Sequence, residues 1–146
     1  MNERLVKGRE DIFFGNEFAV SAVKKLPDDA VRYYVDILRS DGHALRGSFG
    51  WYRELDTTTA QNEQRKARRL TMPVLAIGAE YSTGEGVGAA MKLAADDVQS
   101  MVISGVGHWL AEEAPEELLA ALMEFLAPYR DGEAAAHETH ERSAHT

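Results

Sequence analysis

Residues 73–109 decide the fold, and they read PVLAIGAEYSTGEGVGAAMKLAADDVQSMVISGVGHW. The run 73–78 is apolar throughout, which is typical of a short strand that is buried on both faces of a parallel sheet. After a glycine-rich loop, residues 89–95 have a helical composition, and residues 98–103 form a second apolar run. A strand, a helix and a strand in this order predict one βαβ unit with a right-handed crossover.

On either side of this unit the residues predict helices. Apolar side chains recur at helical spacing over residues 3–55, and a strand-like alternation is almost absent there. Within this region Pro27-Asp28-Asp29 marks a helix start, because proline suits the first turn and acids favour the positive end of a helix. Residues 56–69 are polar, whereas residues 114–126 open with a similar proline-and-acid signal and continue as an apolar helix.

The composition excludes several classes of function. The 16 Lys and Arg residues against 24 Asp and Glu residues give a formal net charge of −8, which disfavours binding to nucleic acid or to an anionic membrane. The absence of cysteine excludes a disulfide framework, a zinc ribbon and a thiol nucleophile. No apolar stretch approaches the ~20 residues that span a bilayer. We therefore expect a cytoplasmic chain with a small-molecule partner, and neither a nucleic-acid nor a membrane partner.

The chain divides into three regions that differ in composition. We expect residues 1–60 to form a helical cap-like region and residues 61–130 to form an α/β core portion. Residues 131–146 have no large apolar side chain and carry an excess of acids, so they predict a disordered tail. We assign no metal site to the three histidines of this tail, because a disordered segment offers a metal no fixed geometry.

His108 is the first catalytic candidate. It directly follows the second predicted strand, at the edge of the sheet where ligands of open α/β folds bind. Gly105 and Gly107 allow a sharp turn that projects the imidazole over the sheet edge, where it can act as a general base near neutral pH. The alternative is a histidine that only packs within a glycine-rich turn.

Three other motifs have a structural as well as a functional interpretation. Residues 84–89 are too far from the preceding strand for a dinucleotide fingerprint, and they indicate a flexible loop and a helix start. The basic cluster 65–69 has no neighbouring aromatic residues and indicates a solvated face. Trp51-Tyr52-Arg53 places aromatic side chains on a helix, where the Tyr52 hydroxyl can donate to a developing oxyanion. The alternative for this motif is core packing of an amphipathic helix.

Together these segments resemble the carboxyl-terminal end of the α/β-hydrolase fold. The resemblance rests on PVLAIG at 73–78, MVISGVGHW at 101–109 and APEEL at 114–118, and it covers residues 4–130. The chain looks most like the branch of epoxide hydrolases and of haloacid or haloalkane dehalogenases, in which the last two strands carry the catalytic acid and histidine. The segment GSFGWYR at 47–53 is similar to the cap-domain segment in which an epoxide hydrolase tyrosine helps to open the ring. The implied fold is α/β, with a helical cap, two parallel strands and flanking helices.

The resemblance also implies roles for individual residues. His108 is implied to be the base that activates water against an ester intermediate, and Tyr52 to be the donor that helps to open the ring. Trp51 and Trp109 are implied to bind the substrate. The resemblance implies neither a metal nor a cofactor.

Two departures from the family pattern concern the remaining catalytic groups. Ser82 occupies the position that aligns with the usual catalytic aspartate, so the acid is expected to be Glu80 or to come from an earlier strand. The early strands and the strand-turn-helix nucleophile of the family have no counterpart in this sequence, and no serine lies between elbow glycines. The chain therefore resembles a truncated hydrolase.

We accordingly expect a truncated α/β-hydrolase that cleaves an epoxide or a carbon–halogen bond through an alkyl-enzyme ester when it is complete, and that is inactive alone. The alternative is a non-catalytic module that forms a homo-oligomer or pairs with a separate amino-terminal half. Exposed strand edges favour such association. We expect the sheet to leave four apolar side chains short of cover, namely Val74, Leu75, Val102 and Ile103.

Overall fold

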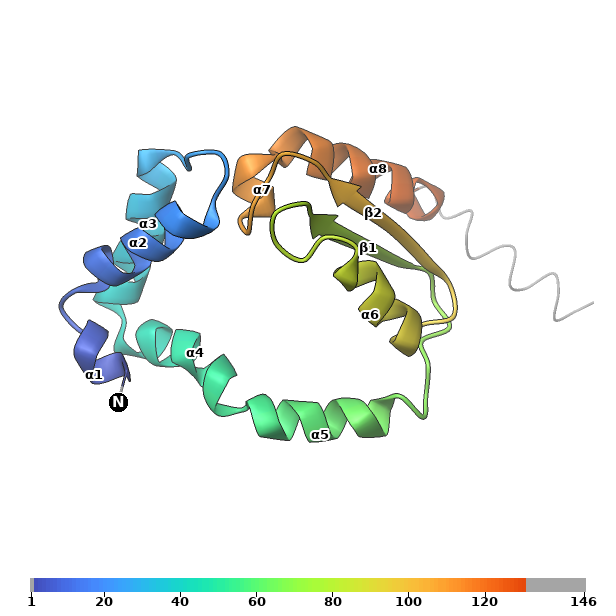
Figure 1. Ribbon diagram of the computed structural model, residues 1–146, viewed down its shortest axis with the longest axis horizontal. Coiled ribbons are helices and arrows are strands. Elements are labelled where there is room, and N and C mark those ends of the chain that lie inside the picture. Colours follow the sequence, from blue (N-terminus) through green and yellow to red (C-terminus); the bar gives the residue numbers. More distant parts are fainter. Residues whose placement is uncertain (1, 131–146) are drawn as a thin grey trace, which may run out of the picture.

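The computed structural model describes residues 2–130, and the predicted tail 131–146 lies outside the described residues. Helices precede and follow a two-stranded parallel sheet (Figure 1). In chain order the elements are α1 (Asn2–Val6), α2 (Glu10–Ser21), α3 (Asp28–Ser40), α4 (Gly42–Arg53), α5 (Leu55–Arg65), β1 (Val74–Ala79), α6 (Gly86–Ala94), β2 (Val98–Ile103), α7 (Leu110–Glu113) and α8 (Pro115–Arg130). The predicted fold class, an α/β chain with two parallel strands and flanking helices, is confirmed.

Helices α1 to α4 make up the helical region. Helix α3 begins at Asp28, directly after Pro27, as the proline-and-acid signal predicts. Phe18 of α2 and Val35 of α3 are buried together with Leu26 of the connecting loop. Burial of these apolar side chains holds α2 against α3.

The polar pattern of residues 56–69 does not predict helix α5. This helix has no buried residue, so no apolar stripe marks it in the sequence. In Figure 1 it runs from the end of α4 towards the loop before β1, and so connects the helical region to the sheet. The two parts of the chain meet at the other end, where the loop between α2 and α3 approaches α7.

The sheet and its crossover helix form the predicted βαβ unit. Strands β1 and β2 pair in parallel over six residues each, and α6 connects them. The core of this part consists of Ala79, Ile103, Val106 and Ala114, of which Val106 is fully buried. The core therefore lies at the carboxyl end of the sheet, directly beneath the loop that carries His108.

The structure corrects one expectation about the sheet. Ile103 is buried, because it packs with the other residues of that core. Val74, Leu75 and Val102 are half-buried, which is incomplete cover for apolar strand residues.

Helix α8 keeps much of its apolar surface in solvent. None of its residues is buried. Four of its large apolar side chains are about half exposed, namely Leu119, Met123, Leu126 and Tyr129. An apolar face of this kind is typical of a surface that another segment covers. Among the described residues, no helix is long and apolar enough to cross a membrane.

A pair of glycines in α6 tests how this helix packs on β2. A Cβ at position 88 would lie 2.6 Å from Ser100 Cβ, whereas a Cβ at position 86 would meet nothing within 4 Å. We expect Gly88→Ala to lower the free energy of unfolding by about 1–3 kcal/mol through overpacking. Gly86→Ala should leave this free energy unchanged or raise it slightly, because the substitution restricts only the unfolded chain. Urea denaturation measures both variants, and equal stabilities would contradict the close packing of α6 on β2.

Candidate active site

Two glycines shape the loop that carries His108. Gly105 has a φ of 72°, a left-handed conformation that favours glycine, and its N–H donates to the Glu80 carboxylate at 2.7 Å. Gly107 packs against the end of α2, where a Cβ would lie 2.5 Å from the Ser21 carbonyl oxygen. The His108 N–H donates to that same carbonyl at 2.8 Å. The loop therefore turns at Gly105 and then docks on the helical region.

One buried carboxylate joins this loop to the helical region. Glu113 of α7 is 5% exposed. Its carboxylate accepts hydrogen bonds from the N–H groups of Val23 and Lys24, at 2.8 and 2.9 Å, which follow α2. It also accepts from the N–H groups of Gly107 and Trp109, at 2.9 and 3.1 Å, on either side of the candidate histidine. A single side chain thus fixes the position of the histidine loop relative to α2.

These hydrogen bonds keep Glu113 ionised. Burial disfavours the charged form, but the four backbone N–H donors outweigh that effect and hold the pKa of Glu113 below its ordinary value of 4.5. A protonated Glu113 would accept fewer of these bonds. The attachment between the two parts of the chain therefore depends on the charge of this carboxylate.

Two further contacts support the same attachment. The Tyr34 hydroxyl of α3 donates to the Glu112 carboxylate of α7 at 2.6 Å, and this hydrogen bond raises the pKa of Tyr34. The Trp109 ring lies 4.6 Å from the Phe18 ring, measured between centroids. Both contacts bring side chains of the helical region onto the segment that follows His108.

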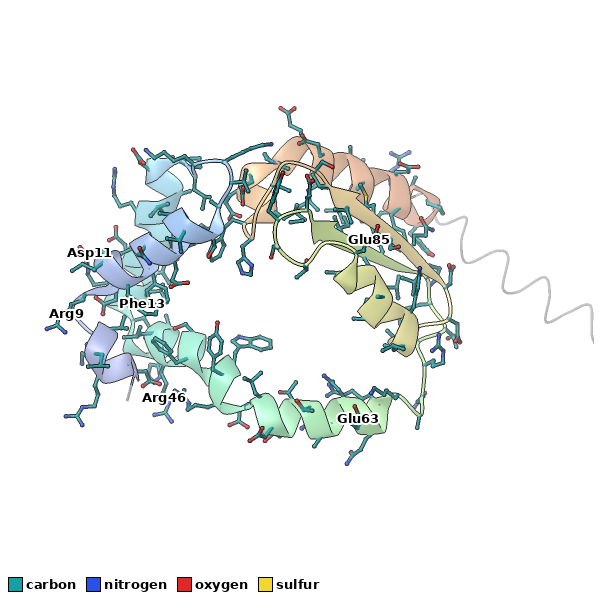
Figure 2. The ribbon with its side chains drawn as sticks, viewed as in Figure 1. Arg9, Asp11, Phe13, Arg46, Glu63 and Glu85 are labelled. Atoms are coloured by element: carbon teal, nitrogen blue, oxygen red, sulfur yellow. The ribbon has the colours of Figure 1, made fainter. Side chains whose placement is uncertain are left out.

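A cavity of about 650 Å³ lies between the histidine loop and helices α2 and α4. Figure 2 shows Phe13 on α2, and its ring centroid is 5.9 Å from that of Phe49 on α4. Aromatic rings form most of the wall, and hydroxyl, imidazole and carboxylate groups form the rest. The lining residues are Phe13, Phe14, Glu17, Ser21, Ser48, Phe49, Tyr52, His108 and Trp109.

The structure brings three of the predicted site residues to this cavity. His108, Tyr52 and Trp109 line it, from the loop after β2 and from α4. Trp51 lies outside the cavity wall and is 79% exposed. Tyr52 is 73% exposed, so the alternative that Trp51 and Tyr52 pack in the core is wrong. The alternative of a histidine that only packs within a glycine-rich turn is wrong as well, because the His108 side chain is exposed and lines the cavity.

The two residues considered at the acid position have different partners. The Glu80 carboxylate accepts from the Gly105 N–H and so stabilises the turn that leads to the histidine. Ser82 Oγ lies 3.3 Å from His108 Nδ1. Of the described residues, Ser82 is the one whose side chain hydrogen-bonds the His108 ring.

The described residues contain no nucleophile elbow. Two strand-to-helix junctions occur within residues 2–130. The first holds Glu80 and Ser82, and the second holds His108. Within the same residues, no group of three or more His, Asp or Glu side chains is placed to hold a metal ion. The arrangement places the His108 imidazole and the Tyr52 hydroxyl at one aromatic cavity.

Sequence reasoning misses Glu113 and the phenylalanines of the wall. Glu113 is one of two adjacent acids between Ala111 and Ala114, and its four partners are backbone amides that no side-chain pattern reveals. Phe13, Phe14 and Phe49 fit helical periodicity and read as core residues. The sequence does carry one signal, because the helices contain more phenylalanines than a single buried stripe can hold. Phe13 accordingly remains 39% exposed.

Comparison with known proteins finds curated relatives and solved structures that are similar to this chain. No protein-family model matches the chain. Over 89 residues the chain is 33% identical to Epoxide hydrolase B of Mycobacterium tuberculosis, and the match covers 58% of this chain and 25% of that protein. The crystal structure of Cfl2 from Burkholderia cenocepacia is similar with a TM-score of 0.77 and 27% identity, over 86% of this chain and 43% of that chain. The epoxide hydrolase CorEH, solved without ligand, gives a TM-score of 0.80 over 88% of this chain and 46% of that chain; at 20% identity this likeness concerns the fold alone.

The chain therefore has part of an α/β-hydrolase fold, of the epoxide hydrolase-like kind. This confirms the resemblance that the sequence motifs indicate. The chain spans about a quarter of the length of the curated relative and less than half of each solved structure.

Glu113→Gln tests the attachment of the histidine loop. At neutral pH we expect the substitution to lower the free energy of unfolding by about 2 kcal/mol, because an uncharged amide replaces a carboxylate that accepts from four N–H groups. The wild-type stabilisation is complete above the ordinary pKa of 4.5 and is lost as the pH falls through the lower pKa of the folded state. The stability difference should therefore narrow in acid.

Denaturation of wild type and variant, from neutral pH down to well below 4.5, measures this narrowing. Glu124→Gln removes one exposed negative charge from α8 and serves as the matched control, with little expected effect at any pH. A difference between wild type and Glu113→Gln that stays constant in acid would contradict the role of the ionised carboxylate.

Proposed function

We propose that residues 2–130 supply the base and the ring-opening donor of an epoxide hydrolase site. The observation that carries this proposal is the shared cavity, since His108 of the loop after β2 and Tyr52 of α4 line the same aromatic wall. The likeness in sequence to Epoxide hydrolase B supports the same reaction class.

The proposed chemistry divides between these two residues. In the first step a carboxylate oxygen bonds to an epoxide carbon and the ring C–O bond breaks, while the Tyr52 hydroxyl donates to the ring oxygen as it gains charge. In the second step His108 takes a proton from water, and the water oxygen attacks the carbonyl carbon of the resulting ester. Collapse of this intermediate breaks the ester C–O bond, and the His108 imidazolium gives its proton to the departing oxygen. The diol leaves, the remaining acid proton passes to solvent, from which Tyr52 regains the proton given to the ring oxygen, and the carboxylate is restored.

The cavity wall favours an epoxide over a haloacid. A haloacid carries a carboxylate that requires a cation, whereas Glu17 is the one charged side chain among the residues that line this cavity. A departing halide needs no proton, whereas the ring oxygen of an epoxide takes one up, so the Tyr52 hydroxyl suits an epoxide better than a halide. We therefore propose a neutral, apolar epoxide as the substrate class.

The ester-forming carboxylate is proposed to come from outside residues 2–130, because neither strand-to-helix junction there presents a nucleophile elbow. The two free edges of the sheet and the half-exposed apolar side chains of α8 suit a partner that adds strands and helices. The second candidate is a non-catalytic module that uses these same surfaces to bind another copy of itself.

Turnover assays with a neutral aryl epoxide test the proposal. We expect no measurable hydrolysis by the chain alone, and hydrolysis when it is joined to the part of Epoxide hydrolase B that it does not match. The completed protein with His108→Gln is the control, and it should not turn over. A completed protein that folds and stays inactive would favour the non-catalytic module.

Turnover by the chain alone would contradict the proposed source of the nucleophile. Glu17 is then the carboxylate to test, because it lines the cavity with His108 and Tyr52. Loss of that turnover in Glu17→Gln would assign the nucleophile to α2.

Tyr52→Phe in the completed protein separates catalysis from packing. The substitution removes only a hydroxyl from a side chain that is 73% exposed, so folding should be unchanged. We expect formation of the ester to slow by about 10²–10³-fold, as for the loss of one oxyanion-stabilising donor. Ester hydrolysis should be spared, since the hydroxyl is needed only while the ring oxygen gains charge. Rapid-mixing kinetics resolves the two steps, and an unchanged first step would remove Tyr52 from the reaction.

Particle mass tests the exposed surfaces of the chain. A compact monomer of this length would have a radius of gyration near ~15 Å. Helix α5 buries no residue, so a monomer of this chain is less compact than that and has a larger radius of gyration. Particle mass therefore distinguishes a monomer from an oligomer better than the radius does. We expect sedimentation to give a multiple of 16.1 kDa at micromolar concentrations. A mass of one chain throughout a dilution series would show that the apolar face of α8 does not drive association.

A further inference from the structure

The His108 ring has a partner that is not a carboxylate. Ser82 Oγ in the loop after β1 lies 3.3 Å from His108 Nδ1. The nearest acid in the same loop, Glu80, has its carboxylate on the Gly105 N–H at 2.7 Å. The described residues therefore place a neutral hydroxyl where a base of this kind is usually supported by a negative charge.

The position of Ser82 relative to the cavity defines what it can do. His108 belongs to the cavity wall and Ser82 does not. Ser82 therefore contacts a residue of the cavity wall without belonging to that wall. With Nδ1 occupied by Ser82, the nitrogen left to serve the cavity is Nε2.

We propose that Ser82 is the positioning residue of His108, and this inference rests on the proposed function. Its hydroxyl oxygen accepts a hydrogen bond from Nδ1–H, which leaves the Nε2 lone pair free to take a proton from water. A hydroxyl orients the ring as an aspartate would, but it adds no negative charge to stabilise the imidazolium that forms. In this site the base is therefore oriented by a neutral hydroxyl, and no negative charge beside Nδ1 stabilises its protonated form.

A serine beside a histidine can also be a nucleophile, and two observations count against that role here. Ser82 is not among the residues that line the cavity, whereas its partner His108 is. The neighbouring N–H groups of Ser82 and Gly84 both donate to the Ala79 carbonyl, at 3.1 and 2.8 Å, and so cannot bind an oxyanion.

The tautomer of His108 in the chain itself tests the positioning role without any epoxide chemistry. Long-range proton–nitrogen NMR spectra distinguish Nδ1–H from Nε2–H, and His108→Gln assigns the signals. We expect Nδ1–H to predominate in wild type and in the conservative variant Ser82→Thr, and the Nε2–H form to gain population in Ser82→Ala. The same mixture of tautomers in wild type and Ser82→Ala would overturn the proposal.

Ser82→Asp tests the missing charge. We expect the Nδ1–H tautomer of His108 to be more populated in Ser82→Asp than in Ser82→Asn, because a carboxylate only accepts hydrogen bonds whereas an uncharged amide can also donate them. Equal tautomer populations in the two variants would overturn the placement of residue 82 against the ring. The other titratable groups around the ring and its loop are unchanged in every variant, namely Glu17, Tyr52, Glu80 and Glu113.

Kinetics of the completed protein adds the catalytic readout. Ser82→Ala should slow ester hydrolysis by about tenfold and leave ester formation unchanged, and Ser82→Thr should restore the rate. Labelling of Ser82 by a serine-directed phosphonate probe would overturn the proposal in favour of a nucleophile. If the His108 tautomer changes in Ser82→Ala as expected but the completed protein hydrolyses no epoxide, the proposed function fails. In that case the positioning of His108 by Ser82 stands.

Discussion

The carboxylate of Glu113 is the interaction on which the rest of the site depends. It accepts from two amides that follow α2 and from two amides that flank His108, so a single group fixes both segments. The sheet places His108 beyond the carboxyl end of β2, and the bonds of Glu113 hold the helical region beside it, where α2 and α4 form the cavity wall. Because burial opposes the charge and the amides favour it, this part of the attachment is strongest while Glu113 is ionised.

The segments that form the candidate site differ from the segments that leave apolar surface exposed. The histidine loop, α2 and α4 hold His108 and Tyr52 at one aromatic cavity, and Glu113 of α7 joins these segments. The sheet has two strands, and α8 buries none of its residues. These exposed elements agree with a chain that spans a quarter to a half of the proteins it resembles. Under the proposed function, one segment would both cover these exposed elements and supply the ester-forming carboxylate.

Much of the fold follows from local patterns, and much of the site does not. The apolar run 73–78 and the glycine-rich turn before His108 predict the βαβ unit and the candidate base, because periodicity and turn chemistry are local. Helix α5 escapes the same reasoning, since a helix without a buried face has no apolar stripe. Glu113 escapes it because its partners are backbone amides, which every residue but proline carries. The contact of Ser82 with the ring depends on how two loops meet in space, and sequence spacing gives no measure of that.

Accumulation of the covalent intermediate is the most direct measurement of the central claim, that His108 hydrolyses an ester formed at this cavity. The completed protein with His108→Gln is incubated with a neutral aryl epoxide, and its intact mass is recorded beside that of the protein with native His108. We expect a mass increase of one epoxide on the variant, and no lasting increase on the protein with His108. A variant that gains no mass would contradict the assignment of His108 as the base. So would a variant that releases the diol at the same rate as the protein with His108.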